Sequence, residues 1–124
     1  MDDFTFEKVM DIHRAVMEKS GGDLRLLSEA NLHELVFRVN CTGNTLAKAS
    51  GAAFLVAAFP PFRDGNKRTA RGIMDFILSR DGYVIVGSEE ELSALISGVV
   101  SFAVEQEDID AWLSTNAQKN AQKS

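Results

Sequence analysis

The chain has very few residues of several structurally informative kinds. Cys41 is its only cysteine, so no internal disulfide can form, and no histidine–cysteine cluster suggests zinc. The only two prolines are adjacent, at positions 60 and 61, where they predict a helix break. The longest apolar run, about residues 52–59, is far shorter than the ~20 residues that cross a membrane. We therefore expect a protein of the reducing cytoplasm that has no membrane partner.

Positive charge is also scarce. Lysine and arginine together number 13 against 18 aspartates and glutamates, which gives a net charge of −5 and a pI near 5.0. Nucleic-acid binding generally needs a basic face, so this balance argues against a nucleic-acid partner. Any anion site must therefore be a local positive spot on an acidic protein. The N-terminal Met1-Asp2-Asp3 is not typical of a signal peptide.

The spacing of apolar residues predicts six helices in a single domain over residues 1–115. We expect them at about 5–19, 28–39, 45–59, 66–80, 89–104 and 108–113. The third is rich in alanine, which allows close helix packing, and we expect it to be central. Residues 83–86 are apolar and β-branched, which predicts one short extended segment. Residues 116–124 repeat Asn-Ala-Gln-Lys without core-forming side chains, which predicts a flexible, frayed C-terminal tail.

The candidate binding residues are concentrated in residues 60–71, which read Pro-Pro-Phe-Arg-Asp-Gly-Asn-Lys-Arg-Thr-Ala-Arg. A turn containing Asp64 and Gly65 opens directly into a predicted helix. The first N–H groups of a helix have no internal partner and lie at its positive end, so they bind phosphate readily. Gly65 allows a sharp turn, and Asp64 is placed to hold a divalent cation. The same end of the helix carries three cations: Lys67, Arg68 and Arg71.

Each of these residues also has a purely structural interpretation. Asp-Gly and Gly-Asn pairs are common in loops, and Asp64 could simply cap the helix. Arg71 could pair with Asp75 across one helical turn instead of contacting a phosphate. For Lys67 and Arg68 we favour phosphate contact, because lysine supplies a compact charge and arginine a bidentate donor.

The stretch closely resembles the signature of the Fic/Doc (fido) family, His-x-Phe-x-(Asp/Asn/Glu)-(Gly/Ala)-Asn-(Gly/Lys)-Arg. Six residues match it: Phe62, Asp64, Gly65, Asn66, Lys67 and Arg68. Lys67 followed by Thr69-Ala70 is similar to the Doc branch, the death-on-curing toxins, whereas Arg71 is similar to the second arginine of the Fic branch. Ile12-His13 and Gly21-Gly22 also resemble the first helix and turn of Doc proteins. The resemblance covers about residues 4–114.

This resemblance implies an all-α, fido-fold bundle of about six helices with at most one short β segment, near Tyr83–Val86. It also implies Mg²⁺ and ATP at the turn, and transfer of a phosphoryl or AMP group to a serine, threonine or tyrosine hydroxyl of a protein. For Doc proteins the known type of target is elongation factor Tu, and an antitoxin is the usual partner. Asp64 would hold the metal, while Lys67 and Arg68 would act in the transfer. The nucleotide contacts would come from five residues: Gly65, Asn66, Lys67, Arg68 and Arg71.

One departure from the signature stands out. The catalytic histidine of the family should stand two residues before Phe62, and Pro60 occupies that position. Proline cannot accept a proton, and a general base contributes about 10²–10⁴ in rate. The sequence therefore leaves two hypotheses open: an impaired transferase, or an inactive nucleotide-binding pseudoenzyme that acts through a protein partner. Proline here is compatible with natural loss of the base or with a substitution introduced to silence a toxin.

The two histidines and residues 101–106 are further candidates for a functional role. The only histidines are His13, which we expect to be a packed structural residue, and His33, which we expect to be exposed. Spacing places neither of them near Asp64. Residues 101–106, Ser-Phe-Ala-Val-Glu-Gln, faintly resemble the inhibitory helix of some Fic proteins, but Gln106 misses the last position. We expect this segment to be ordinary core helix.

Overall fold

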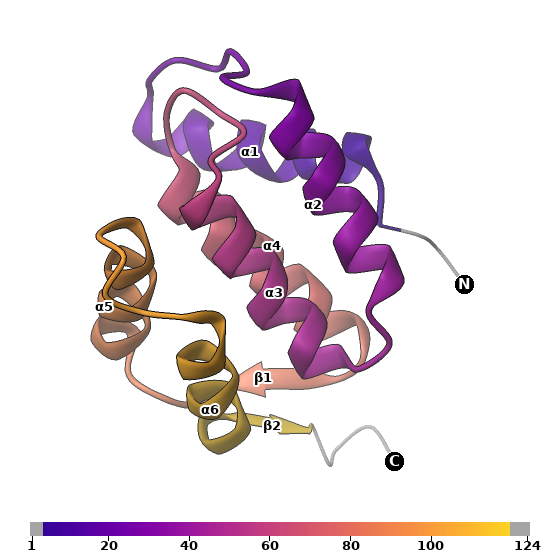
Figure 1. Ribbon diagram of the computed structural model, residues 1–124, viewed down its shortest axis with the longest axis vertical. Helices are drawn as coiled ribbons and strands as arrows, with labels where there is room; N and C mark the ends of the chain where they lie inside the picture. Colours follow the sequence, from indigo (N-terminus) through magenta and orange to yellow (C-terminus); the bar gives the residue numbers. More distant parts are fainter. Residues whose placement is uncertain (1–3, 120–124) are drawn as a thin grey trace.

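The protein is described by a computed structural model over residues 4–119, in which helices dominate (Figure 1). Six helices and two short strands occur in this range: α1 (Phe6–Ser20), α2 (Glu29–Cys41), α3 (Thr45–Ala58), α4 (Asn66–Arg80), β1 (Tyr83–Ile85), α5 (Glu89–Val100), α6 (Gln106–Asn116) and β2 (Ala117–Lys119). The predicted all-α class with about six helices is confirmed. None of these helices combines the length and apolar character that a membrane-spanning helix needs.

Most helices begin where a short polar side chain accepts an N–H of the first turn. Thr5, Ser28, Asn44 and Ser88 do so for α1, α2, α3 and α5, respectively. The start of α6 is closed by Asp108, which accepts the N–H of Glu105. Helix α4 begins differently: no side chain caps it, because its N-cap residue is a glycine. This exception determines where the functional site lies.

Helix α3 is the centre of the bundle, as its composition predicts. Its small side chains are almost fully buried, among them Ala49, Ala52, Ala53 and Ala57. Because alanine adds little bulk, α2, α4, α5 and α6 can all pack directly against it. Figure 1 shows α3 running beside α4 through the middle of the molecule, with α5 and α6 along one side of this pair. The pair α3–α4 is therefore the rigid base of residues 59–65, the motif loop, which joins the two helices.

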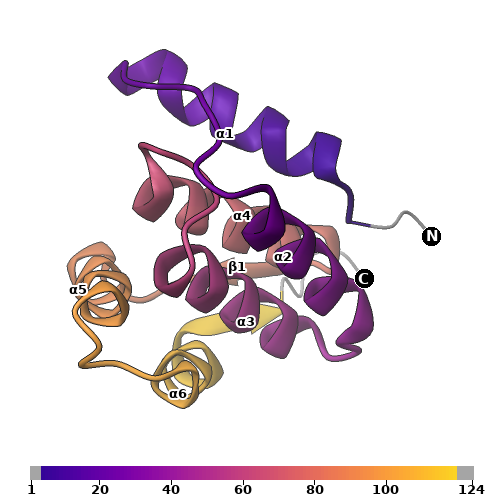
Figure 2. The ribbon, with the colours of Figure 1, turned by 45° about the horizontal axis from the view of Figure 1, so that its top comes forward.

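Helix α1 lies against the other side of α4, where it is clearly visible in Figure 2. The approach is close at Gly72, where an added Cβ would stand only 2.8 Å from Cγ2 of Ile12. The buried face of α1 carries Val9, His13 and Met17 at intervals of four residues. As a result, His13 and Met17 lie beneath the turn that precedes α4.

The extended segment predicted near Tyr83–Val86 is present as β1. It pairs antiparallel with β2, so that Tyr83 faces Lys119 and Ile85 faces Ala117. The sequence predicts a frayed tail at this point, yet residues 117–119 are an ordered strand. The reason is that β1 offers unpaired N–H and C=O groups, which the tail satisfies without needing apolar side chains. The predicted flexibility of residues 120–124 concerns positions outside the described residues.

Helix α5 ends at Val100, four residues earlier than predicted. The N–H groups of Ala103 and Val104 both turn back to the carbonyl of Gly98, and Phe102 adopts a φ of 66°. Gly98 has no Cβ, which leaves room for the Val104 side chain. The prediction that residues 101–106 are core helix is therefore wrong. They form a linker, and only Gln106 belongs to a helix, as the first residue of α6.

The left-handed backbone of Phe102 predicts a stabilising substitution. A Cβ in this conformation costs roughly 1–2 kcal/mol, and the ring is 85% exposed, so its removal loses little burial. Phe102→Gly should raise the free energy of unfolding by about 1 kcal/mol in urea denaturation. Phe102→Ala keeps the Cβ and should gain much less. Equal stability of the glycine and alanine variants would contradict this account of the α5–α6 linker.

Candidate functional site

The loop before α4 is fixed by the segment that leads into α2. The carbonyl of Pro61 accepts the N–H groups of Leu27, at 2.7 Å, and Ser28, at 3.1 Å. The N–H of Arg63 donates to the carbonyl of Arg25 at 3.1 Å. Residues 25–28 and 61–63 thus lie side by side, like two short strands. The conformation of the motif loop is set by these backbone contacts, which the motif itself does not encode.

Phe62 and Asn66 close the loop from within. Phe62 is fully buried, and its carbonyl accepts a hydrogen bond from Nδ2 of Asn66 at 2.7 Å. Oδ1 of Asn66 accepts the N–H of Phe62 at 3.1 Å. Both ends of the amide are therefore engaged with the loop. The backbone N–H of Asn66 makes no hydrogen bond within residues 4–119, so it is the group of this residue most available to a ligand.

Gly65 has to be glycine for two reasons. Its φ is 76°, in the left-handed region, and an added Cβ would collide with Sδ of Met17. The first bond that enters the helix runs from the N–H of Thr69 to the carbonyl of Gly65, at 2.9 Å. The N–H groups of residues 66, 67 and 68 make no hydrogen bond within the described part of the chain. They form an open, positively polarised helix end.

This helix end faces a pocket of about 550 Å³ between α4 and α5. The pocket is lined by all six of the residues for which the sequence predicts ligand contacts: Asp64, Gly65, Asn66, Lys67, Arg68 and Arg71. Helix α5 supplies the opposite wall through Leu92, Ser93 and Ile96. Pro60 is not among the lining residues. The fold thus brings the predicted contact residues to one cavity and leaves the position of the expected base outside its lining.

The cations of the pocket differ in how far they are engaged. The side chain of Arg68 is exposed and forms no hydrogen bond or ion pair with any residue between 4 and 119. Lys67 makes one long contact, with Nζ 3.5 Å from Oγ of Ser97 on α5. Both side chains are therefore available to an anion that enters the pocket.

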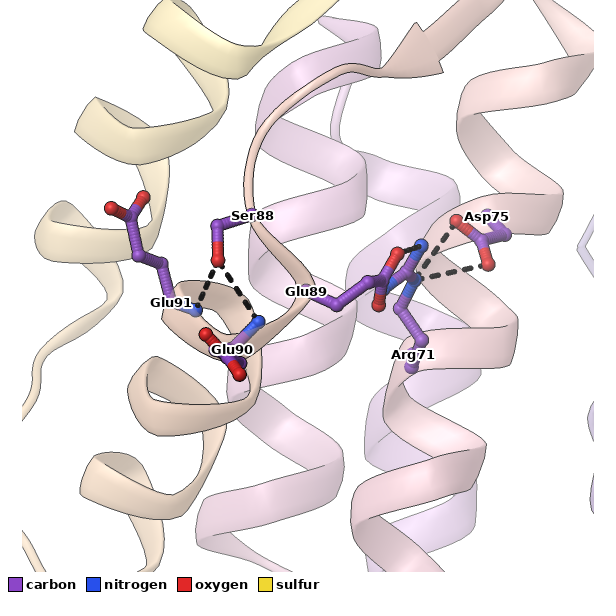
Figure 3. A network of polar contacts seen from close by, with 6 residues as sticks. All are labelled: Arg71, Asp75, Ser88, Glu89, Glu90 and Glu91. Carbon is purple, nitrogen blue, oxygen red and sulfur yellow. Dashed lines mark hydrogen bonds and ion pairs between the residues drawn. The ribbon is translucent and has the colours of Figure 1, made fainter.

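Arg71 is held by two carboxylates (Figure 3). Its Nε lies 3.0 Å from Oδ2 of Asp75, and its Nη2 lies 2.9 Å from Oε2 of Glu89 on α5. A second contact joins Nη1 to the other oxygen of Glu89. The hydrogen bond between them lowers the pKa of Glu89 and raises the pKa of Arg71 further. The predicted ion pair of Arg71 with Asp75 is therefore present. The local sequence did not reveal the second partner of Arg71, Glu89.

Asp64 is exposed at the edge of the pocket. Its Oδ1 accepts the N–H of Gly65 at 3.1 Å, and its Oδ2 lies 3.4 Å from the N–H of Asp23. Hydrogen bonds from Arg25 lower the pKa of Asp23 to about 2, so this second carboxylate is committed to its own partner. No group of three or more potential metal-ligating side chains occurs within residues 4–119. A divalent ion here would therefore be held by Asp64 together with phosphate and water oxygens.

The two histidines lie in different environments. His13 is 2% exposed, its Nε2 is 2.9 Å from the carbonyl oxygen of Asp64, and its ring stacks on Phe62. It is the packed, hydrogen-bonded residue that was predicted, and it contacts Asp64, which the spacing of the two residues did not indicate. The two residues are 51 positions apart in the sequence, which hid this contact from any argument on spacing. His33 is exposed as predicted, with its Nε2 3.9 Å from Glu29 on α2.

Taken together, the fold and the site define an all-α protein with a glycine turn that opens a cationic helix start into a cavity. The sequence profile of the Fic/DOC family matches residues 3–78, more than half of the chain, and the protein belongs to this family. Membership indicates a function of the AMP-transfer or phosphotransfer type. The match ends within α4, earlier than the resemblance to about residue 114 suggested. A comparison with curated proteins gives no significant match.

The contact between Arg71 and Glu89 predicts that Glu89 opposes anion binding. Glu89→Gln removes the charge that neutralises Arg71, so affinity for inorganic tripolyphosphate should rise about three- to tenfold in calorimetry. Because the pKa of Glu89 lies below its ordinary 4.5, the carboxylate stays ionised at any pH above that value. Lowering the pH from about 7 to about 5.5 should therefore not reproduce the effect of the substitution.

The matched control is Glu90→Gln, which removes the same charge from the next residue of α5. The Glu90 side chain points away from Arg71, as Figure 3 shows, so its loss should change affinity only slightly. If the two variants bind tripolyphosphate equally well, the contact with Arg71 has no specific effect and only net charge matters.

Proposed function

We propose that the pocket binds the phosphates of Mg²⁺-ATP and that the chain is a Doc-type transferase with impaired activity. The observation that carries the proposal is the uncapped start of α4, whose three free N–H groups face a cavity of about 550 Å³. Helix starts of this kind bind phosphate through aligned N–H groups and the helix dipole. In this function the protein would transfer a phosphoryl or AMP group to a hydroxyl of another protein.

Each pocket residue has a defined part in this proposal. The N–H groups of residues 66–68 would donate to phosphate oxygens, and Arg68 would add a bidentate contact. Lys67 would add a point charge from the same turn. Asp64 would share the Mg²⁺ with the phosphates. When bound, Mg²⁺-ATP supplies the group to be transferred, and the residues of the chain orient it and neutralise its charge.

The size and lining of the cavity favour a nucleotide over a small inorganic anion. A volume of about 550 Å³ lies within the range of roughly 300–1,000 Å³ that is usual for small-molecule sites. Leu92 and Ile96 give the α5 wall an apolar character opposite the charged helix start. Such a division suits a ligand with a charged end and a flat, weakly polar end.

The missing component is a proton acceptor. Pro60 cannot take a proton from an attacking hydroxyl, and neither His13 nor His33 lines the cavity. Phosphoryl transfer depends mainly on positioning and charge neutralisation, so slow turnover is compatible with the loss of a base worth about 10²–10⁴ in rate. From the resemblance to Doc proteins, the proposed target is a serine, threonine or tyrosine of a cytoplasmic protein such as elongation factor Tu, and an antitoxin is the proposed regulator.

A second candidate function is that of a pseudoenzyme, which binds nucleotide and acts through a protein partner. Two observations favour it. The first is Pro60 itself. The second is Phe59, the residue before it, which is 55% exposed beside a cavity of about 230 Å³ over α2 and α3. An exposed aromatic ring beside a hollow is typical of protein-binding surfaces.

Binding of Mg²⁺-ATP, measured by calorimetry, tests the proposed site directly. Arg68→Ala should weaken binding at least about tenfold, because a charge-assisted contact to phosphate contributes about 1.5–3 kcal/mol. Arg63→Ala is the matched control, since Arg63 is an exposed arginine of the same loop that does not line the cavity. It should bind within about twofold of wild type. Failure of the wild-type protein to bind Mg²⁺-ATP would refute the proposed function.

Restoring a base separates the two candidate functions. For an impaired transferase, Pro60→His should raise transfer to purified elongation factor Tu at least about 100-fold over wild type. ATP labelled at the γ- or the α-phosphate distinguishes phosphoryl from AMP transfer. Pro60→Ala removes the proline without adding a base and should stay near background. A folded Pro60→His protein that binds Mg²⁺-ATP but transfers neither label would support the pseudoenzyme.

A further inference from the structure

His13 makes two contacts with the motif loop, although it belongs to a different helix. Its Nε2 lies 2.9 Å from the carbonyl oxygen of Asp64. Its ring stacks on Phe62 with the centroids 3.6 Å apart and the planes 3° from parallel. The side chain is almost completely buried, at 2% exposed. A backbone carbonyl can only accept, so Nε2 carries the proton and donates it.

The consequence for the loop follows from the geometry of the peptide bond. In a planar trans peptide the C=O and the N–H point in opposite directions. The carbonyl of Asp64 points inward to His13, so the N–H of Gly65 must point away from His13. It meets Oδ1 of Asp64 at 3.1 Å, a carboxylate that lines the pocket. This face of the peptide therefore already accommodates negative charge.

The neighbouring contacts keep this peptide in place. Met17 lies one turn after His13 on the same buried face of α1, and its side chain fills the space where a Cβ on Gly65 would stand. The left-handed φ of 76° at Gly65 then directs the chain into α4. Rotation of the Asp64–Gly65 peptide would lose the bond to His13 and leave a carbonyl unpaired beside a buried ring.

We propose that His13 is a positioning residue for the anion site and not a substitute general base. By holding the Asp64 carbonyl inward, it keeps the N–H groups at the start of α4 turned toward the pocket. The inference rests on the proposed function, because it assigns His13 a part in the binding of polyphosphate there. Its Nε2 proton is committed to the loop, and His13 does not line the cavity, so it cannot receive a proton from a substrate hydroxyl.

Two substitutions separate the hydrogen bond from the packing. His13→Phe keeps an aromatic ring to stack on Phe62 but has no donor. His13→Gln loses the ring but keeps an N–H donor at a similar reach. Val9→Ala is a matched control for stability alone, because Val9 is fully buried one turn earlier on the same face of α1.

The experiment measures affinity for inorganic tripolyphosphate by calorimetry, together with the amide signal of Gly65 in ligand-free NMR spectra. His13→Phe should weaken binding about five- to tenfold, the effect of one lost hydrogen bond, and should shift the Gly65 amide. His13→Gln should bind within about twofold of wild type. Val9→Ala should lose stability without losing affinity. Loss of stability alone would then not account for the weaker binding of His13→Phe.

Four outcomes would contradict the positioning role of His13. Wild-type affinity in His13→Phe, or an equal loss in His13→Gln and His13→Phe, would overturn the inference while leaving the proposed function intact. If Val9→Ala weakens binding as much as His13→Phe does, affinity follows stability and the inference is also wrong. Absence of tripolyphosphate binding by the wild-type protein would overturn the inference and count against the proposed function.

Discussion

The arrangement of the site depends on three backbone N–H groups that find no partner among residues 4–119. They belong to residues 66–68, at the start of α4, and no side chain caps them. Burying unpaired donors is costly, so they must face solvent or a ligand. The left-handed Gly65 makes this arrangement sterically feasible, and the closed amide of Asn66 prevents the loop from folding back over the helix end. The remaining elements hold this small region in position.

Support comes from both sides of α4. On one side, α1 packs closely across Gly72 and places His13 beneath the loop. On the other side, α5 supplies the second wall of the cavity and reaches Arg71 through Glu89. The central α3 fixes α4 itself, because its alanines allow neighbouring helices to approach from several directions. A rigid scaffold of this kind orients donors before any ligand arrives, which lowers the entropy lost on binding.

The sequence predicted well whatever depends on residues close together in the chain. Helix α4 begins and ends as expected, and the predicted contact residues line one cavity, because helical spacing and a glycine turn are local properties. The sequence did not predict the features that depend on contacts between distant segments. The strand at residues 117–119 exists only through its pairing with β1, and α5 ends early because Val104 packs back on Gly98. Likewise, neither the Asp64–His13 nor the Arg71–Glu89 contact leaves a signature in either partner's own neighbourhood.

The boundary of the family match divides the lining of the cavity. The profile ends at residue 78, so the charged half of the cavity lies inside the shared region and the α5 wall lies outside it. Substitutions at Leu92, Ser93 or Ile96 can therefore reshape what sits beside the phosphates without altering the turn that receives them. The two walls of the cavity belong to different helices, so the α5 wall can change in shape while the turn before α4 stays the same.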